Sequence, residues 1–201
     1  MTQPAIKLTY FRLTVRAELS RLALVYGGIN FEDERIPGAV MKELKPKLPL
    51  GQLPLLELDG KAYIQSMAIA RYAGRLGGIY PSDPVAALKV DMMLETLHEA
   101  MDKYVDVRFH TKDAELQAEK AKVAADQFFP KIFNFVEKTV EGKFFFGDEI
   151  SLADLYLFDV VTNCMHVGFT DFSFDSYPKV QAIVEAVKAT PRVAAYLASH
   201  A

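Results

Sequence analysis

The segment Leu48–Glu57 reads LPLGQLPLLE and places Pro54 directly before an apolar run typical of a β-strand. Proline has no N–H, so it leaves the strand ladder short of one donor and requires a special backbone geometry. If the Leu53–Pro54 bond is cis, the Leu53 N–H and C=O face outward at the strand edge, where an extended peptide ligand can pair with them. An ordinary trans proline in a loop is the alternative, because only about 5% of X–Pro bonds are cis in folded proteins.

The sequence around this segment mixes strand-like and helical patterns. Apolar residues alternate over the first strand-like run, and the first helical pattern stops at a Gly-Gly pair. After the proline, an Asp-Gly pair predicts a hairpin turn. The predicted elements are strands over Ile6–Phe11 and Phe31–Ile36, a hairpin over Leu55–Ile64, and helices over Arg16–Tyr26 and Ser66–Leu76. This order predicts a small mixed sheet flanked by helices.

The stretch Tyr80–Pro84 marks a predicted domain boundary, and everything after it has the period of helices. The predicted helices are a long one over Val85–Val105, another over Val123–Val136, a short one that begins at Ser151–Asp154 with Ser151 as its cap, and two over Tyr177–Ala189 and Pro191–Ser199. We therefore expect two domains, residues 1–78 and residues 84–201, of which the second is all-helical.

The composition favours a protein that acts on a small molecule. Apolar residues make up 51% of the 201 residues and the net charge is −3, which gives no field that points to nucleic acid. No apolar run reaches the ~20 residues that span a bilayer, and no signal peptide is evident, so we expect a cytoplasmic location. The single cysteine, Cys164, lies in an apolar helical run, and the four histidines lack metal-ligand spacing. We expect a buried Cys164, no disulfide and no metal.

The pair Gln65–Ser66 stands at the start of a predicted helix. At that position Ser66 can offer its hydroxyl and its backbone N–H to an anion at the positive end of the helix dipole, and a carboxylate would suit the site. The alternative is that Ser66 is only an N-cap and Gln65 a solvated side chain.

Together these residues resemble the cytosolic glutathione transferases, most closely the sigma-like class. The motifs that carry the resemblance are Leu8–Phe11 (LTYF), Arg16–Glu18 (RAE), Leu53–Pro54 (LP), Gln65–Tyr72 (QSMAIARY) and Ser151–Asp154 (SLAD). The resemblance implies an α/β thioredoxin-like N-terminal domain that binds glutathione and an all-α C-terminal helical bundle that contributes the electrophile site. It also implies a homodimer that uses glutathione as a co-substrate and needs no cofactor.

The resemblance assigns catalysis to Tyr10 and Arg16. Glutathione's thiol, like that of free cysteine with a pKa of ~8.5, is mostly protonated at neutral pH, so the protein must favour the thiolate. A Tyr10 hydroxyl that donates to the sulfur stabilises the charged form. Arg16 matches an arginine that adds positive charge near the thiolate, although an arginine at a helix start is otherwise solvated.

The resemblance also assigns the glutathione contacts. Gln65 and Ser66 match the γ-glutamyl contacts, Leu53 matches the backbone contact to the cysteinyl unit, and Lys45 matches a basic residue near the glycine carboxylate. Lys45 belongs to a lysine cluster that is solvated in the alternative interpretation. The full predicted set is Tyr10, Met41, Lys45, Gln52, Leu53, Pro54, Gln65, Ser66 and Glu99.

Glu99 corresponds to an acidic residue that reaches glutathione from the neighbouring subunit, with Glu95 and Asp91 as alternatives. The second substrate is expected between Leu13 of the first domain and the helix that carries Met101, Tyr104 and Val105.

Two departures from the family pattern concern this site. Thr14-Val15 stands where relatives often have Arg-Gly, and Met41 stands where they often have tryptophan, which the chain lacks altogether.

Three functions share these residues. The leading hypothesis is conjugation of glutathione to hydrophobic electrophiles. The alternatives are a glutathione-dependent isomerisation such as prostaglandin synthesis, and a noncatalytic binder or structural relative. A glutaredoxin-like redox role is disfavoured because the predicted turn over Phe11–Arg16 contains no cysteine.

Overall fold

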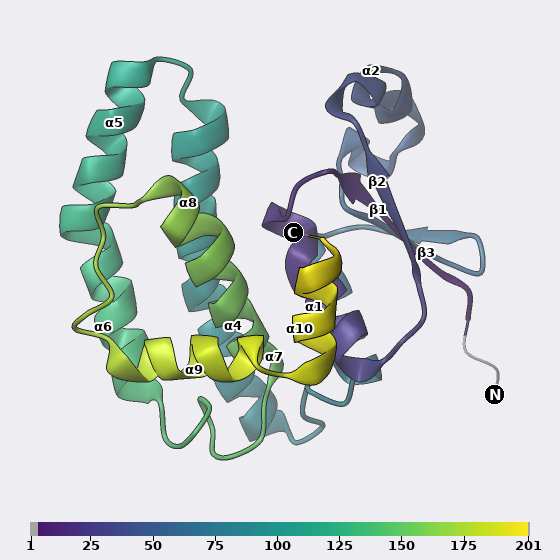
Figure 1. The fold of residues 1–201 in the computed structure, drawn as a ribbon. Coiled ribbons are helices and arrows are strands. Elements are labelled where there is room, and N and C mark those ends of the chain that lie inside the picture. The colour runs from purple at the N-terminus through teal and green to yellow at the C-terminus, as the bar shows by residue number, and fades with distance from the viewer. Residues whose placement is uncertain (1–3, 201) are drawn as a thin grey trace. The chain divides into compact units, whose positions relative to one another are not determined.

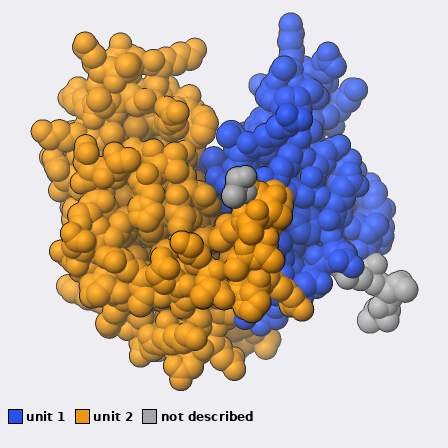
Figure 2. Space-filling view, in the orientation of Figure 1, with its two compact units in different colours: residues 1–80 blue, residues 81–201 orange. Residues whose placement is uncertain are grey.

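The computed structural model describes residues 4–200, and the chain divides into two units, Met1–Tyr80 and Pro81–Ala201 (Figure 2). Unit 1 contains every strand assigned within the described residues, and unit 2 is helical. The predicted thioredoxin-like fold of the first part and the helical fold of the second are thus confirmed.

Unit 1 is a four-stranded mixed sheet in the order β2-β1-β3-β4 (Figure 1). β1 pairs in parallel with β2 and antiparallel with β3, and β3 and β4 form the predicted hairpin. The elements are β1 Ile6–Phe11, α1 Val15–Gly27, β2 Glu32–Ile36, α2 Met41–Leu44, β3 Leu55–Leu58, β4 Lys61–Tyr63 and α3 Ser66–Leu76. The hairpin turns at Asp59 and Gly60, whose φ angles of 48° and 79° are typical of the predicted Asp-Gly turn.

Helices α1 and α3 pack against each other, and their C-terminal ends meet backbone to backbone. A Cβ atom on Gly27 would lie 2.5 Å from the Cα of Gly77, so neither helix end can carry a larger residue there without moving. Gly28, with φ 66°, then ends α1 in the left-handed conformation.

Two long helical segments run antiparallel in unit 2 (Figure 1). We call them the arms: one is α4, and the other is α5 followed by α6. The helices of unit 2 are α4 Pro84–Val105, α5 Ala114–Val123, α6 Phe129–Thr139, α7 Leu152–Asp159, α8 His166–Gly168, α9 Pro178–Lys188 and α10 Pro191–Ser199. The predicted long helices are present, but π-helical turns interrupt the arms, at Asp106–His110 after α4 and at Ala124–Phe128 between α5 and α6. A third π-helical turn, Val160–Met165, follows α7. The apolar period did not reveal these turns, because one extra residue per turn changes it little.

An aromatic cluster fills one end of the unit 2 core. Phe133 is completely buried and its ring lies 4.9 Å from that of Phe174 and 5.9 Å from that of Tyr177, centroid to centroid. Cys164 is also buried, as predicted, and burial raises the pKa of its thiol well above the ordinary value.

The predicted cap of α7 is a capping box in which Asp154 carries most of the bonding. Ser151 N–H and its hydroxyl both donate to Asp154 Oδ2, and Phe145 N–H donates to Oδ1 at 2.9 Å. Burial raises the pKa of Asp154, and these hydrogen bonds oppose that shift. The carboxyl therefore ties the loop before α7 to the helix it caps.

Candidate functional site

The topology of unit 1 brings several of the predicted glutathione residues to one end of the sheet, where β1, β2 and β4 end and β3 begins. Thr9 of β1 pairs with Leu55 of β3, and Leu56 of β3 pairs with Tyr63 of β4. Tyr10 follows Thr9 on β1, Pro54 directly precedes β3, and Gln65 follows β4 by two residues, so all three lie at the same end of the sheet. β1 and β2 are parallel, so the carboxyl end of β2 meets the same edge.

Tyr10 is the penultimate residue of β1 and is 5% exposed. Its ring lies edge-on to Phe11, with centroids 5.3 Å apart, and the guanidinium carbon of Arg21 lies 5.8 Å from its centroid. The Tyr10 ring therefore contacts the ring of its chain neighbour Phe11 and the buried guanidinium of Arg21.

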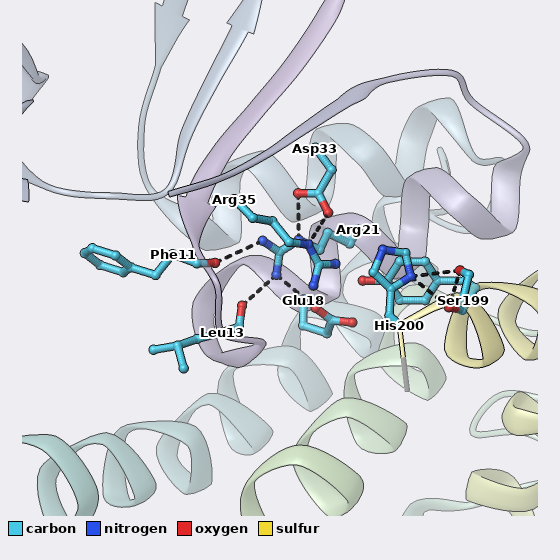
Figure 3. A network of polar contacts seen from close by, with 9 residues as sticks. Phe11, Leu13, Glu18, Arg21, Asp33, Arg35, Ser199 and His200 are labelled. Atoms are coloured by element: carbon cyan, nitrogen blue, oxygen red, sulfur yellow. Dashed lines mark hydrogen bonds and ion pairs between the residues drawn. The ribbon is translucent and has the colours of Figure 1, made fainter. Parts of the chain in front are cut away.

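Arg21 of α1 organises the loop that follows Tyr10, and Figure 3 shows its contacts. Its side chain has no exposed surface. One amino group donates to Leu13 O at 2.7 Å and to Glu18 Oε2 at 3.0 Å, and the other donates to Phe11 O at 3.4 Å. Nε donates to Asp33 Oδ1 at 3.0 Å, and these partners offset the cost of burying the charge.

Arg21 was not among the residues predicted from the sequence. The available signal was its place between Leu19 and Leu22 on the buried face of α1, three residues after Glu18, where only a paired arginine is tolerated. Arg35 of β2 reaches the second oxygen of Asp33 at 2.7 Å from the more exposed side of the same network (Figure 3).

Arg16 lies in the first turn of α1 and is half-buried. The residue before it, Val15, has a φ of 40°, a left-handed conformation that β-branched side chains rarely adopt. Val15 thus has a backbone conformation that suits glycine, the residue expected there from the family pattern. Such strain persists where the surroundings impose it, and here Arg21 holds the carbonyl of Leu13 beside it.

The Leu53–Pro54 bond is cis, so of the two alternatives that the sequence left open the trans proline is excluded. Leu53 lies just outside β3, and among residues 4–200 no backbone group bonds to its N–H or C=O. An unpaired amide and carbonyl at a strand end suit an extended peptide that adds to the sheet edge.

Gln65 and Ser66 follow the hairpin at the same end of the sheet. Gln65 is exposed and has φ 77° and ψ 105°, while Ser66 is the first residue of the eleven-residue helix α3. The strained Gln65 backbone turns the chain sharply into α3, whose N-terminus is suited to a carboxylate.

The remaining predicted residues of unit 1 lie on the segment between β2 and β3. The Lys45 side chain runs over Gly51, where a Cβ would lie 3.0 Å from its Cγ, and both Lys45 and Gln52 are exposed. Met41, the first residue of α2, is half-buried.

The structure separates the residues predicted for the second substrate between the two units. Leu13 of unit 1 is 44% exposed, whereas Met101, Tyr104 and Val105 are buried within unit 2. Met101 Sδ lies 3.6 Å from the Cys164 sulfur. Burial raises the pKa of Tyr104, with Cys164 adding to the shift and Arg108 opposing it. A pocket shared by these residues stays a prediction.

Glu99 lies on α4 in unit 2 and is exposed.

In the described part of the chain, no group of three or more His, Cys, Asp or Glu side chains could hold a metal ion. None of the helices formed by residues 4–200 is long and apolar enough to cross a membrane.

Comparison with known proteins gives consistent matches along the chain. Residues 6–75 match the glutathione S-transferase N-terminal domain, and residues 98–200 match the glutathione S-transferase C-terminal domain. The hematopoietic prostaglandin D synthase of Gallus gallus is 32% identical over 195 residues, 96% of each chain. S-crystallin 4 of Enteroctopus dofleini is 31% identical over 209 aligned residues, also 96% of each. The solved structure of a Fasciola hepatica sigma class GST superposes with a TM-score of 0.86 at 27% identity, covering 100% of this chain and 98% of the other.

Proposed function

Because the chain belongs to the cytosolic glutathione transferase family and is sigma-like, we propose that it binds glutathione as a thiolate and conjugates it to hydrophobic electrophiles in the cytoplasm. The observation that supports the proposal is that Tyr10, Pro54 and Gln65 lie at the same end of the sheet. This end unites a hydroxyl donor, an unpaired strand end and a helix N-terminus, which are the groups that a tripeptide with a thiol and two carboxylates requires.

In this mechanism the tripeptide pairs with Leu53 N–H and C=O as an additional strand. Its γ-glutamyl end lies at Gln65 and Ser66, and its glycine carboxylate lies near Lys45. The sulfur then faces Tyr10, whose hydroxyl donates to it. Each unit by which the pKa of the thiol falls corresponds to about 1.4 kcal/mol of preference for the thiolate.

Arg16 contributes positive charge near the sulfur from the first turn of α1. The protein's remaining contribution is to hold nucleophile and electrophile in position.

Turnover with an aromatic halide tests the proposal. We expect Tyr10→Phe to lower the rate at least tenfold and to abolish the ultraviolet difference band of bound thiolate while glutathione still binds. The matched control is Tyr26→Phe, in the last turn of α1, far along the helix from Arg16. Equal rates in wild type and Tyr10→Phe would remove Tyr10 from the mechanism.

The names of two relatives support two alternative functions, a glutathione-dependent isomerase and a noncatalytic binder. One relative is named a prostaglandin D synthase and another a crystallin, so family membership alone leaves the activity open. An isomerase would convert a substrate without consuming glutathione, and a binder would retain glutathione in calorimetry with no turnover. Product analysis with an electrophile panel and with an isomerisation substrate separates the three.

We also propose a homodimer in which Glu99 reaches the neighbouring subunit's glutathione. The support is a stripe on α4 in which Val85, Leu88 and Met92 are 64%, 67% and 42% exposed. Glu99 lies seven residues beyond Met92 and therefore on the same helix face. Leu88→Lys should yield a monomer in sedimentation, and it should weaken glutathione binding as much as Glu99→Gln does. A dimeric Leu88→Lys protein would argue against this interface.

A further inference from the structure

The chain between Tyr10 and Arg16 passes through a strained residue, Val15. Its φ of 40° lies in the left-handed region, where Cβ crowds the following carbonyl oxygen. A β-branched side chain adds to the crowding because its χ1 is restricted. The folded protein therefore holds Val15 in a conformation that an unrestrained chain would leave.

The residues next to Val15 do not account for this conformation. Thr14 is the N-cap residue of α1, and its side chain caps no N–H in the described helix. Thr14 O accepts a hydrogen bond from Ala17 N–H at 3.3 Å, but ordinary turns with negative φ form the same bond. Since strained backbone persists only where the surroundings impose it, the restraint on Val15 comes from farther away.

Arg21 supplies a restraint from the second turn of α1. One of its amino groups donates to Leu13 O at 2.7 Å, and the other donates to Phe11 O at 3.4 Å (Figure 3). The residue between these two is tied to β2, because Arg12 N–H donates to Ile36 O at 3.2 Å. Three consecutive residues before the turn thus have their backbone held, so the strained φ cannot relax unless this segment or α1 moves.

The guanidinium that holds these carbonyls is itself fixed by two carboxylates. Its Nε donates to Asp33 Oδ1 at 3.0 Å, and the amino group that bonds Leu13 O also donates to Glu18 Oε2 at 3.0 Å. The Arg21 side chain has no exposed surface, so turning it would separate buried charges from their partners. Arg21 therefore acts as a rigid clamp on the segment before Val15.

Both residues that are proposed to act on the glutathione sulfur flank this turn. Tyr10 precedes the clamped segment, and Arg16 follows Val15 directly. The guanidinium carbon of Arg21 also lies 5.8 Å from the centroid of the Tyr10 ring. Rotating the φ of Val15 into the right-handed region would swing the first turn of α1, and Arg16 with it, relative to Tyr10. The placement of the two catalytic groups therefore depends on the φ of Val15.

From this arrangement we propose that Val15 is a strained hinge held by the Arg21 clamp, and that the two are positioning residues for thiolate formation by Tyr10 and Arg16. The inference rests on the proposed function, because it concerns the same sulfur. Glycine, the residue expected at the hinge from the family pattern, adopts a positive φ at little cost. Valine at this position makes the chain depend on its clamp.

The ultraviolet band of the bound glutathione thiolate tests the proposal. Arg21→Lys keeps the charge but loses the planar fork that bonds both carbonyls. It should raise the pKa of the bound thiol and lower the band near neutral pH about threefold. In a Val15→Gly background the same substitution should lower the band by less than about 1.5-fold, because the hinge no longer needs the clamp.

Three further variants are the controls. Val15 is 6% exposed, and Val15→Ala removes its methyl groups but keeps Cβ and a restricted φ, so the Arg21→Lys loss should persist in that background. Asp33→Asn weakens the clamp without removing it and should lower the band by a smaller factor, which provides a test if Arg21→Lys does not fold. Arg35→Lys, on the more exposed side of the network, should leave the band unchanged.

A measurement without ligand separates this inference from the proposed function. Hydrogen exchange of the Ala17 amide, which closes the turn, should quicken about tenfold with Arg21→Lys and much less in the Val15→Gly background. A wild-type thiolate band that neither Arg21→Lys nor Asp33→Asn lowers would overturn the hinge and leave the proposed function standing. Equal losses in the valine and glycine backgrounds would overturn it too. A wild type with no thiolate band would remove the proposed function and, with it, the positioning role of Val15.

Discussion

The functional regions of the two units are built from different features. In unit 1 the site depends on the backbone, through a cis Leu53–Pro54 bond, a positive φ at Gln65 and carbonyls held by the buried Arg21. In unit 2 the core is apolar and aromatic, and π-helical turns interrupt its long helices. The comparison indicates that buried hydrogen bonds and ion pairs position the backbone of the unit 1 site, which we call polar anchoring. In unit 2, apolar packing determines the arrangement of the helices.

The largest expected loss of stability comes from Arg21→Met, which removes buried ion pairs and hydrogen bonds of unit 1. The substitution removes the buried cation that pairs with Glu18 and Asp33 and donates to the carbonyl of Leu13, and should cost about 3–5 kcal/mol of unfolding free energy. Chemical denaturation, with hydrogen exchange of β1 and α1 amides, measures it. Arg35→Met is the control, because Arg35 also contacts Asp33 but its side chain is 26% exposed, so its loss should stay under about 1 kcal/mol. Equal losses would show that burial of Arg21 does not anchor the loop.

The corresponding change in unit 2 removes packing without touching charge. Phe133→Leu should cost about 2 kcal/mol, because Phe133 is completely buried among aromatic rings. Phe135→Leu, on the same helix but 42% exposed, should cost a few tenths of a kcal/mol. Thermal and chemical unfolding of both variants would measure the difference. A Phe133→Leu loss no larger than that of Phe135→Leu would mean that the cluster does not stabilise unit 2.

This contrast also explains what the sequence could predict. The Asp-Gly hairpin was predictable, because Asp59-Gly60 restricts the backbone locally, whereas Pro54 left cis and trans as alternatives that only the structure separates. Arg21 was missed because its partners Leu13 and Asp33 meet it only after β1, α1 and β2 assemble.

The π-helical turns of unit 2 were missed for a related reason. An inserted residue alters the apolar period too little to be seen in one sequence.

A smaller effect separates stability from binding at the sheet edge. Gln65→Gly relieves the strain of φ 77° and should stabilise unit 1 by about 0.5–1 kcal/mol, after allowing for the greater entropy of unfolded glycine. It should at the same time raise the dissociation constant for glutathione, because the side chain is lost. Leu50→Gly is the control, since Leu50 has φ 53° and is 71% exposed. It should stabilise similarly with glutathione binding unchanged, and calorimetry that finds both variants binding equally would remove Gln65 from the site.

The smallest effect concerns the surface charges of β1 and β2, where pH provides the test. The pKa of Glu34 is lowered first by the hydrogen bond from Thr9 and then by Lys7, while burial opposes the shift. The pKa of Lys7 is raised, chiefly by its hydrogen bond to Glu34 at 3.0 Å. The stabilisation by Glu34 is therefore present above its ordinary value of 4.5 and is lost as the pH falls through its folded-state pKa. That by Lys7 is present below 10.5 and is lost as the pH rises through its own.

Glu34→Gln should accordingly reduce the unfolding free energy by less than about 1 kcal/mol near neutral pH, because both side chains are partly exposed. The difference from wild type should shrink at both ends of the pH range. Glu32→Gln is the matched control, since Glu32 is 66% exposed and lies 3.6 Å from the same ammonium. A difference between wild type and Glu34→Gln that stays constant with pH would assign the effect to the neutral contact with Thr9 rather than to charge. Polar anchoring in unit 1 would then be confined to its buried network around Arg21.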